Sequence, residues 1–340
     1  MEHPDIQNPS FPHHPAGSES FRLPLLVIAG PTASGKSTLA IKLAPALDGE
    51  VINCDSAQIY QELSIITART EPDEMEEIPH HLTGHCQLWD KYSAARYQQE
   101  AYQIIMDIHR RGHLPILCGG TFLYMKAVME GYDLREIPCD PEKTRQFHDR
   151  TQKLSNQALY LELEISDPVA ASRIHPNNRR RVLRALEVIE STGEKFSDRH
   201  RKNPFHPLGI SPILVVIVPD RDTLYRRIEN RTDKMFESGA IEEIRHLVNT
   251  GRREALEDAQ ILGAGEILSF LDGFCTLEEG ITLVKRNTRR YAKRQFTWIR
   301  SLNPQIVLGH VCSGNINQTQ YHRIVSTIKE LLPASGNRNK

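Results

Sequence analysis

The feature that most constrains the fold of this chain is a glycine-rich loop between a predicted strand and a predicted helix. The loop runs from Gly30 to Ser37 and reads Gly-Pro-Thr-Ala-Ser-Gly-Lys-Ser. The apolar run Leu23 to Ala29 before it predicts a buried strand, and Thr38 to Leu47 after it predicts a helix. In such a loop the backbone amides converge on phosphate oxygens, the Lys36 ammonium adds a positive charge, and the Ser37 hydroxyl can hold Mg²⁺. The sequence therefore predicts an α/β fold with a site for a di- or triphosphate, and a chance match in a Gly/Ser turn is the alternative.

The predicted diphosphate-binding or nucleotide-binding residues are Gly30, Pro31, Thr32, Ala33, Ser34, Gly35, Lys36 and Ser37, with Ser37 also the predicted Mg²⁺ ligand.

Length and composition indicate one large domain with a substantial insertion. The chain has 340 residues, of which 39% are hydrophobic. No apolar run approaches the roughly 18 residues of a membrane span, and the first twenty residues contain no Lys or Arg. The cysteines are scattered without a Cys-x-x-Cys pair. We therefore expect a soluble, cytoplasmic, monomeric protein with free thiols and no structural zinc.

Charge is unevenly distributed in a chain whose net charge is only −1. Nine cations and four acids lie between Arg173 and Lys202, and seven cations and no acid lie between Ile281 and Arg300. Either segment alone fits a solvated helix face, but two such segments in a neutral protein favour a polyanionic partner.

The order of predicted strands and helices indicates a parallel sheet that a helical segment interrupts. Further strands are predicted at Glu50 to Cys54, Leu114 to Cys118, Pro212 to Pro219 and Gln305 to Leu308, and Ser93 to Arg111 has helical spacing. After the strand Pro212 to Pro219, helices are predicted near Asp222 to Ser238, Ala240 to Asn249 and Leu277 to Leu302, with a tail helix at Gln318 to Leu332. We expect a disordered tail at 1–21, a phosphate-loop (P-loop) NTPase-like core from 22–130 and 208–340, and a helical insertion at 131–207.

Two polar residues follow predicted strands at the edge where α/β proteins place their sites. Asp55 ends the second strand, so its carboxylate should face the same crevice as Lys36, where it is a candidate base. A helix N-cap or an indirect Mg²⁺ ligand is the alternative role for Asp55. Thr121 follows Gly119-Gly120 and is a candidate hydrogen-bond donor in that crevice, or a plain turn residue.

These residues and several other blocks resemble one family, the tRNA dimethylallyltransferases. The matching blocks are Gly30 to Ser37, Asp55-Ser-Ala-Gln-Ile-Tyr60, Pro79-His-His-Leu82, Gly119-Gly-Thr121 with Leu123-Tyr124, His175-Pro-Asn177 with Arg184 to Glu187, and Thr288-Arg289 with Ala292-Lys-Arg-Gln295 and Thr297-Trp298. Six blocks in order make the resemblance specific. It implies a phosphate-loop core with a helical insertion domain that binds the tRNA anticodon stem-loop, and dimethylallyl diphosphate as the prenyl donor.

The resemblance assigns chemical roles to the candidate residues. Asp55 is the base that takes a proton from the adenine amine, and Thr121 lies beside the reacting centre. Arg231 becomes a diphosphate contact, although on its own it would be a surface helix arginine. Amides from Thr32 to Ser37, Lys36 and Mg²⁺ at Ser37 would stabilise the charge on the leaving diphosphate.

The resemblance also implies a set of tRNA contacts in both basic segments and in three loops. These residues are Asp55, Ser56, Ala57, Gln58, Thr121, Arg180, Arg181, Val182, Leu183, Arg184, Gln260, Ile261, Leu262, Gly263, Ala264, Gly265, Lys285, Arg289, Lys293 and Arg294.

The chain departs from the family pattern in a few places. Ile65 to Thr70 keeps a cation at Arg69 but lacks the usual glycine, and Gly84 replaces an acidic residue. Phe122 fills a position that is often small. Gly263-Ala-Gly-Glu266 lacks the aromatic residue and the cation that the family has there. The phosphate-loop and base positions are intact, so we expect an active enzyme.

Three other functions compete with prenyl transfer to tRNA. A small-molecule kinase would share the loop and sheet but would not explain the basic insertion. A prenyltransferase acting on free adenine nucleotides would not need that insertion either. An RNA-binding protein with a vestigial phosphate loop would tolerate the altered block at Gly263 to Glu266.

Overall fold

The computed structural model describes residues 23–75, 77–90, 92–131, 134, 140–199, 209–309 and 317–333. The predicted disordered tail lies outside these residues. The chain divides into two compact units, one built from the described parts of Met1–Met125 and Pro207–Lys340, and the other from those of Lys126–His206. The second unit begins within helix α3 (Phe122–Glu130), whereas the sequence prediction placed this boundary at residue 131.

The first unit contains a six-stranded parallel sheet in the order β3-β2-β4-β1-β5-β6. The strands are β1 (Leu23–Ala29), β2 (Gly49–Cys54), β3 (His80–His81), β4 (Leu114–Gly119), β5 (Ile210–Ile217) and β6 (Ile306–Leu308). Strand β1 lies at the centre, where Leu26 is in register with Ile116 of β4 and Ile213 of β5. The central strands are apolar because both faces are covered. The predicted α/β fold with a parallel sheet is confirmed.

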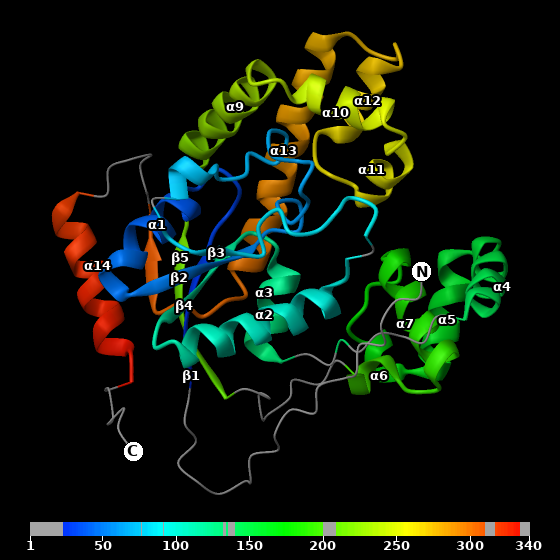
Figure 1. Cartoon of the computed structure of the whole chain (residues 1–340). Helices are drawn as coiled ribbons and strands as arrows, with labels where there is room; N and C mark the ends of the chain where they lie inside the picture. The colour runs from blue at the N-terminus through cyan, green and yellow to red at the C-terminus, as the bar shows by residue number, and fades with distance from the viewer. Residues whose placement is uncertain are drawn as a thin grey trace, which may run out of the picture. The chain divides into compact units, whose positions relative to one another are not determined.

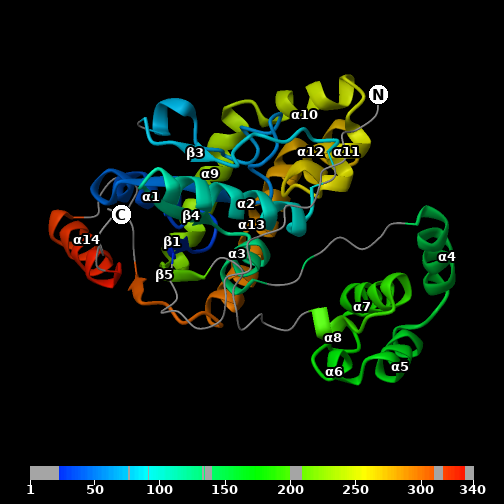
Figure 2. The ribbon, with the colours of Figure 1, turned by 60° about the horizontal axis from the view of Figure 1, so that its bottom comes forward.

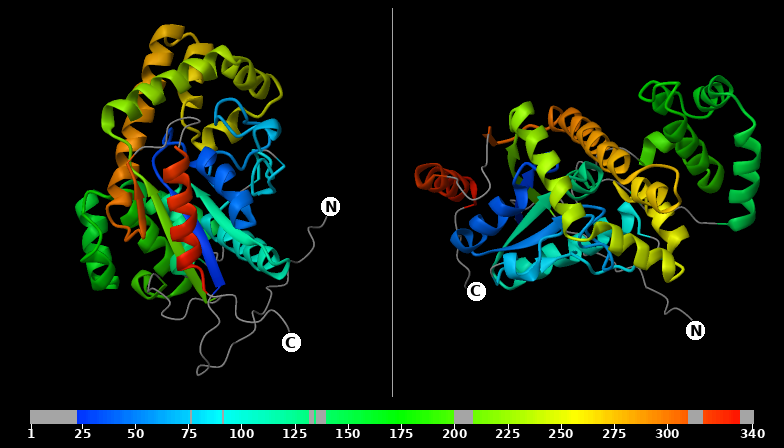
Figure 3. Two further views of the ribbon diagram at one scale, coloured as in Figure 1. Left: turned by 90° about the vertical axis from the view of Figure 1, so that its left-hand side faces the viewer. Right: turned by 90° about the horizontal axis from the view of Figure 1, so that it is seen from above.

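Helices cover both faces of the sheet. Apolar residues of α1 (Lys36–Leu47) and α14 (Gln318–Leu331) share one core with side chains of the central strands, and Figure 1 shows the two helices side by side. The left view of Figure 3 shows α14 running along this face. Helix α2 (Ala94–Arg110) connects β3 to β4, and a right-handed crossover places it on the opposite face.

Five helices gather beyond the carboxyl ends of the strands (Figures 1 and 2). They are α9 (Arg221–Glu237), α10 (Ala240–Asn249), α11 (Arg253–Ala259), α12 (Ala264–Leu271) and α13 (Leu277–Ile299). Most of them share a core with the segment that follows β2. A short 3-10 helix, Pro72–Met75, lies in that segment. The sequence analysis did not predict α3, α11, α12 or the two-residue strand β3.

The second unit is helical and has its own core. Its helices are α4 (Pro141–Gln152), α5 (Asn156–Ser166), α6 (Pro168–Ala171), α7 (Arg179–Thr192) and α8 (Phe196–Arg199). Leu159, Leu163 and Leu186 are among the residues that form its core. Buried Asp167 joins two of the helices, because its carboxylate accepts hydrogen bonds from the Ala170 amide at 3.0 Å and the Ser197 amide at 2.7 Å. Within the described parts of the chain, no helix is long and apolar enough to cross a bilayer.

Candidate active site

The phosphate loop lies at the carboxyl end of β1 and turns directly into α1. Gly35 adopts a left-handed conformation with φ of 93°, and the helix begins at Lys36. The Lys36 Nζ donates a hydrogen bond to the Pro31 carbonyl at 2.7 Å. Burial lowers the pKa of Lys36 to about 8, and the charge of Asp55 is among the influences that oppose this lowering. The pKa of Lys36 therefore lies close to neutral pH, and an anionic ligand would favour the charged form of its amine.

Not every amide of the loop is available to a ligand. The Thr32 amide donates to the side chain of Gln295 at 2.8 Å, and the Ser34 amide donates to the Pro31 carbonyl at 3.3 Å. The predicted set of free amides from Thr32 to Ser37 is corrected accordingly, because two of them are already engaged. The first-turn amides of α1 remain, since a helix start has no intrahelical acceptor for them.

Ser34 carries the clearest sign of a missing polar ligand in the loop. Its side chain is fully buried, and its Oγ has no hydrogen-bond partner among the described residues. A buried hydroxyl left without a partner costs about 1–3 kcal/mol. An anionic oxygen in the loop would supply that partner, so this residue fits a phosphate ligand.

The structure brings Asp55 and Thr121 together from strands β2 and β4. The Thr121 amide donates to the Cys54 carbonyl at 3.0 Å, and the Ser56 amide donates to the Thr121 Oγ1 at 2.9 Å. Both residues next to Asp55 in the chain are therefore bonded to Thr121. Gly119 is needed for this approach, because a Cβ there would lie 2.0 Å from the Cys54 carbonyl oxygen. One Asp55 oxygen accepts from the Ala57 amide at 3.0 Å, which orients the carboxylate.

Arg231 reaches the same edge from α9. Its side chain is half-buried, and the Nη2 donates to the Thr67 carbonyl at 2.7 Å. Burial lowers the pKa of Arg231 and the charge of Asp55 opposes that shift. Asp55 thus acts electrostatically on both Lys36 and Arg231. The surface position expected for Arg231 from its sequence context alone is wrong.

Ser37 is the exposed residue of the loop and lines a small cavity. The other lining residues include Asn53, Gln58, Thr70 and Thr83, which all carry side-chain oxygens. No group of three or more His, Cys, Asp or Glu residues that could hold a metal occurs in the described parts of the chain. This donor set cannot form an all-protein metal cage. It fits Mg²⁺, which binds through one or two protein oxygens together with substrate phosphates and water.

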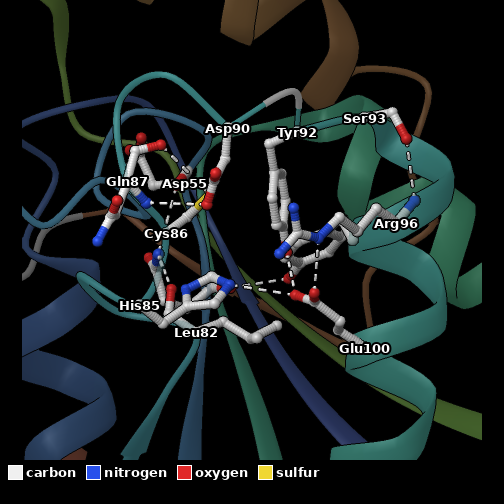
Figure 4. A network of polar contacts seen from close by, with 12 residues as sticks. Asp55, Leu82, His85, Cys86, Gln87, Asp90, Tyr92, Ser93, Arg96 and Glu100 are labelled. Carbon is white, nitrogen blue, oxygen red and sulfur yellow. Dashed lines mark hydrogen bonds and ion pairs between the residues drawn. The ribbon is translucent and has the colours of Figure 1, made fainter. Parts of the chain in front are cut away.

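A polar network anchors the loop before α2 (Figure 4). Glu100 accepts hydrogen bonds from the Tyr92 hydroxyl at 2.6 Å and from the Arg96 Nε at 2.9 Å, and its carboxylate lies 3.1 Å from the His85 Nε2. Burial opposes ionisation of Glu100, but these hydrogen bonds lower its pKa to about 2. The Ser93 side chain caps α2 beside them. The network holds Tyr92 in place.

Aromatic residues to which the sequence analysis gave no role in the site lie near the end of β2, which precedes Asp55. Tyr97 and Tyr124 are buried and stacked with ring centroids 4.3 Å apart, and Tyr92 lies 6.5 Å from Tyr124. The Tyr97 hydroxyl donates to the Asn53 carbonyl at 2.8 Å. Burial raises the pKa of Tyr124, and the charge of Asp55 adds to the increase. The helical spacing of Tyr97 is visible in the sequence, but its proximity to Tyr124 is not.

Tyr291 is a second residue that the sequence analysis missed. It lies on α13, is half-buried, and lies close enough to Thr121 for that side chain to influence its pKa. Burial raises the pKa of Tyr291 to about 12, with Asp55 contributing, so the phenol stays protonated at neutral pH. The basic residues around it in the sequence drew attention to charge rather than to this contact.

The predicted tRNA contacts of the core unit fall into distinct environments. The Gln58 Nε2 donates to the Thr67 and Ala68 carbonyls, so this side chain supports the loop that also holds Arg231. Lys285 and Arg289 form ion pairs with Asp233 and Glu229 of α9, at 2.6 and 2.8 Å. Lys293 and Arg294 are exposed, whereas Ile261 and Ala264 are core residues of the helical group.

The predicted contacts on α7 also divide between surface and core. Arg180 and Arg181 are exposed. Arg184 is exposed as well, and its guanidinium lies 2.8 Å from Glu187. Val182 is buried in the core of the helical unit and Leu183 packs against that core, which leaves little of these two side chains for RNA. Any contact between Val182 and RNA would therefore have to come from its backbone.

Two departures from the family pattern are linked in space. The Arg69 Nη1 donates to the Tyr60 carbonyl at 2.8 Å. A Cβ on Gly84 would lie 2.4 Å from that same nitrogen, so the glycine makes room for the arginine. The altered block at Gly263 to Glu266 borders a hollow of about 360 Å³ that Gln260 and Gly265 help to line. Open space surrounds Gly265, where the family pattern has a cation.

Comparison with known proteins gives consistent similarities. Residues 58–302 match the family model described as IPP transferase. The chain is 42% identical over 276 residues to a tRNA dimethylallyltransferase of Carboxydothermus hydrogenoformans, covering 81% of this chain and 88% of the relative. It is 40% identical over 278 residues to the tRNA dimethylallyltransferase of Bacillus subtilis, covering 82% and 88%.

Solved structures extend this similarity to the fold. The full-length tRNA isopentenylpyrophosphate transferase of Bacillus halodurans superposes with a TM-score of 0.66 at 38% identity, over 91% of this chain and 96% of that one. A eukaryotic dimethylallyltransferase captured acting on tRNA gives a TM-score of 0.76 at 30% identity, over 93% of this chain and 81% of that one.

Proposed function

The chain belongs to the IPP transferase family, and from that premise we propose that it is a tRNA dimethylallyltransferase. It transfers a dimethylallyl group from dimethylallyl diphosphate to the exocyclic N6 amine of the adenine 3′ of the anticodon and releases diphosphate. The observation that carries this proposal is the grouping of one carboxylate with two cations. The loop of Lys36 follows β1 and Asp55 follows β2 at the carboxyl edge of one parallel sheet, and the charge of Asp55 influences the pKa of both Lys36 and Arg231. A base and the cations for a leaving diphosphate therefore share this edge.

Asp55 supplies the base. The lone pair of the adenine amine is delocalised into the ring, so removal of its proton as the C–N bond forms lowers the barrier. The hydrogen bond from the Ala57 amide to one carboxylate oxygen orients the group. Thr121 sits beside this base and is tied to the Ser56 amide, which supports a role in placing the acceptor.

The phosphate loop supplies the leaving-group site. As the C–O bond of the donor breaks, the electron pair stays with the diphosphate, and fixed donors must meet that charge. Lys36, Arg231, the buried Ser34 hydroxyl and the first-turn amides of α1 are the donors that this chain offers. Ser37 would hold Mg²⁺ together with diphosphate oxygens, and the metal would neutralise part of the negative charge.

The tRNA partner requires that the target base leave its stack. A single-stranded anticodon loop makes this extrusion cost only about a few kcal/mol. The exposed cations Arg180 and Arg181 on α7 and Lys293 and Arg294 on α13 are suited to phosphate contacts, which provide affinity and register. We also propose that the enzyme is monomeric and cytoplasmic, and the free cysteines among the described residues support the second of these.

The proposal is tested by incubating the protein with Mg²⁺, dimethylallyl diphosphate and an anticodon stem-loop RNA that carries adenine 3′ of the anticodon. We expect the RNA to gain the mass of one dimethylallyl group. A matched RNA with purine riboside at that position lacks the amine and should gain nothing. Prenylation of free AMP but not RNA would indicate the nucleotide-specific alternative, and ATP turnover without RNA modification would indicate a kinase.

A further inference from the structure

Gln295 on α13 is a buried polar residue whose amide joins two distant segments of the core unit. Its Oε1 accepts a hydrogen bond from the Thr32 amide of the phosphate loop at 2.8 Å. Its Nε2 donates to the Gly120 carbonyl at 2.9 Å, in the turn between β4 and α3. Both bonds span long stretches of sequence. One side chain thus connects α13, the phosphate loop and the turn that carries Thr121.

The two bonds require a carboxamide in one orientation. The Thr32 amide needs an acceptor and the Gly120 carbonyl needs a donor, so the oxygen and nitrogen of Gln295 cannot exchange places. The fit around the side chain is close, because a Cβ on Gly120 would lie 2.5 Å from its Nε2. A methionine of similar length would make neither bond. An ionised glutamate would keep the acceptor and lose the donor.

The segments that Gln295 joins are the two halves of the proposed active site. Thr32 belongs to the loop that would bind the leaving diphosphate. Gly120 precedes Thr121, which bonds to both residues flanking the base Asp55. One helical turn before Gln295, Tyr291 lies close enough to Thr121 for that side chain to influence its pKa. Through Gln295, helix α13 contacts both the phosphate loop and the Gly120-Thr121 turn.

We propose that Gln295 is a positioning residue that holds the phosphate loop and the Gly119 to Thr121 turn in register. It touches neither substrate, and it keeps the leaving-group donors and Asp55 aligned on the reacting atoms at the same moment. This inference rests on the proposed prenyl transfer. Misplacement of reacting groups by about 1 Å can lower a rate by about 10²-fold, so a small shift of either segment is enough.

The test compares Gln295→Met with Gln305→Met. Gln305 makes a comparable acceptor bond at an exposed position beside β6, because its Oε1 accepts a hydrogen bond from the Leu214 amide at 2.7 Å. Thermal unfolding, the dissociation constant for inorganic diphosphate with Mg²⁺, and kcat and KM for RNA prenylation are measured for each. For Gln295→Met we expect kcat to fall about 100-fold and diphosphate binding to weaken. For Gln305→Met we expect kcat and the diphosphate dissociation constant to stay within about twofold of those of the unmodified protein.

Gln295→Glu separates positioning from simple loss of packing. When protonated, its carboxylic acid can accept from Thr32 and donate to Gly120, and when ionised it can only accept. Burial disfavours the ionised form. We therefore expect the ratio of its kcat to that of the unmodified protein to rise as pH falls from about 8 to 5.5, a rescue that a purely structural role would not produce.

The outcomes distinguish the inference from its premise. If the unmodified protein transfers no prenyl group to RNA, the proposed function fails. If it is active, and Gln295→Met loses no more kcat than Gln305→Met at equal loss of thermal stability, the positioning role is overturned. A flat pH ratio for a folded Gln295→Glu also counts against it.

Discussion

The carboxyl edge of the core sheet and helix α7 of the helical unit are both rich in functional candidates, yet they are built differently. At the sheet edge, Asp55 and Arg231 are half-buried, with Asp55 bonded to the nearby Ala57 amide and Arg231 to the Thr67 carbonyl of another segment. On α7, Arg180 and Arg181 are exposed, and neither has an ion-pair partner among the described residues. Half-buried groups held by hydrogen bonds in one site act together, whereas exposed charges act separately and are screened by salt. We therefore expect few large effects at the edge and several small ones on α7.

The largest effect is expected for Asp55→Asn, which keeps the acceptor for the Ala57 amide but removes the base. The kcat for RNA prenylation should fall about 10²- to 10⁴-fold, because proton removal by a positioned base is lost. RNA affinity, measured by filter binding, should change by less than about twofold. Asp222→Asn, at an exposed position in the first turn of α9, is the matched control. An equal loss of RNA affinity and kcat would mean that Asp55 is chiefly an RNA contact.

The next effect is expected for Lys36→Met, measured as diphosphate affinity by calorimetry. Loss of a charge-assisted contact should weaken binding about 10- to 100-fold at pH 7. Because burial lowers the pKa of Lys36 to about 8, the affinity of the unmodified protein should also fall as pH rises above 8. Lys234→Met, at an exposed position on α9, should retain that pH dependence, and Lys36→Met should lack the part due to Lys36.

The charge of Lys36 favours diphosphate binding, but its lowered pKa predicts that this charge reduces the folding stability of the ligand-free protein. A buried ammonium whose pKa lies below its ordinary value of 10.5 destabilises the free protein at pH below about 8, and that cost disappears as pH rises. The thermal unfolding midpoint of ligand-free Lys36→Met at pH 7 should thus equal or exceed that of the unmodified protein. A clear decrease would show that Lys36 is a structural residue of the loop.

An intermediate effect is expected for Asp167→Ala, which should weaken the helical unit and leave the sheet edge of the core unit unchanged. Asp167→Ala removes a buried carboxylate that accepts amide hydrogen bonds from Ala170 and Ser197, so the helical unit should lose about 1–3 kcal/mol. Hydrogen exchange in α5 and α7 should increase, and RNA binding should weaken, while diphosphate affinity is unchanged. Burial opposes ionisation of Asp167, but its hydrogen bonds lower the pKa. Its contribution to stability is present above the unfolded-state pKa and is lost as pH falls through the lower folded-state value.

The smallest effect is expected for Arg181→Ala. RNA affinity should weaken by about three- to tenfold, and the slope of log K against log salt should decrease by about one, because one phosphate contact is lost. Arg184→Ala should have a smaller effect, since Glu187 already pairs with that guanidinium. Prenylation kcat at saturating RNA should be unchanged for both. A large fall in kcat for either variant would contradict the proposed difference between the sheet edge and α7.

Much of the architecture was predictable because it depends on local patterns. The central strands are apolar runs, and the ends of several helices carry Gly or capping residues, so their bounds are close to those observed. Strand β3 was missed because two residues carry no periodic signal. Helix α12 was missed because it follows a left-handed Gly263 inside a block that was interpreted only as an RNA contact.

The candidate site was less predictable because its groups meet across the fold. Arg231 has the sequence context of an exposed helix residue, and only the packing of α9 onto the loop at Thr67 buries it. Tyr291 lies among cations, so charge patterning hid its contact with Thr121.

The linear pattern of residues was enough to predict a phosphate loop between a buried strand and a helix, followed by a carboxylate at the end of the next strand. These features depend on residues close together in the chain, where backbone geometry and periodicity act directly. Which loop amides remain free, and which side chains align the site, depends instead on the packing of distant segments. Gln295 meets Thr32 and Gly120 because α13 packs there, and a bond between such distant residues leaves no local pattern in the sequence.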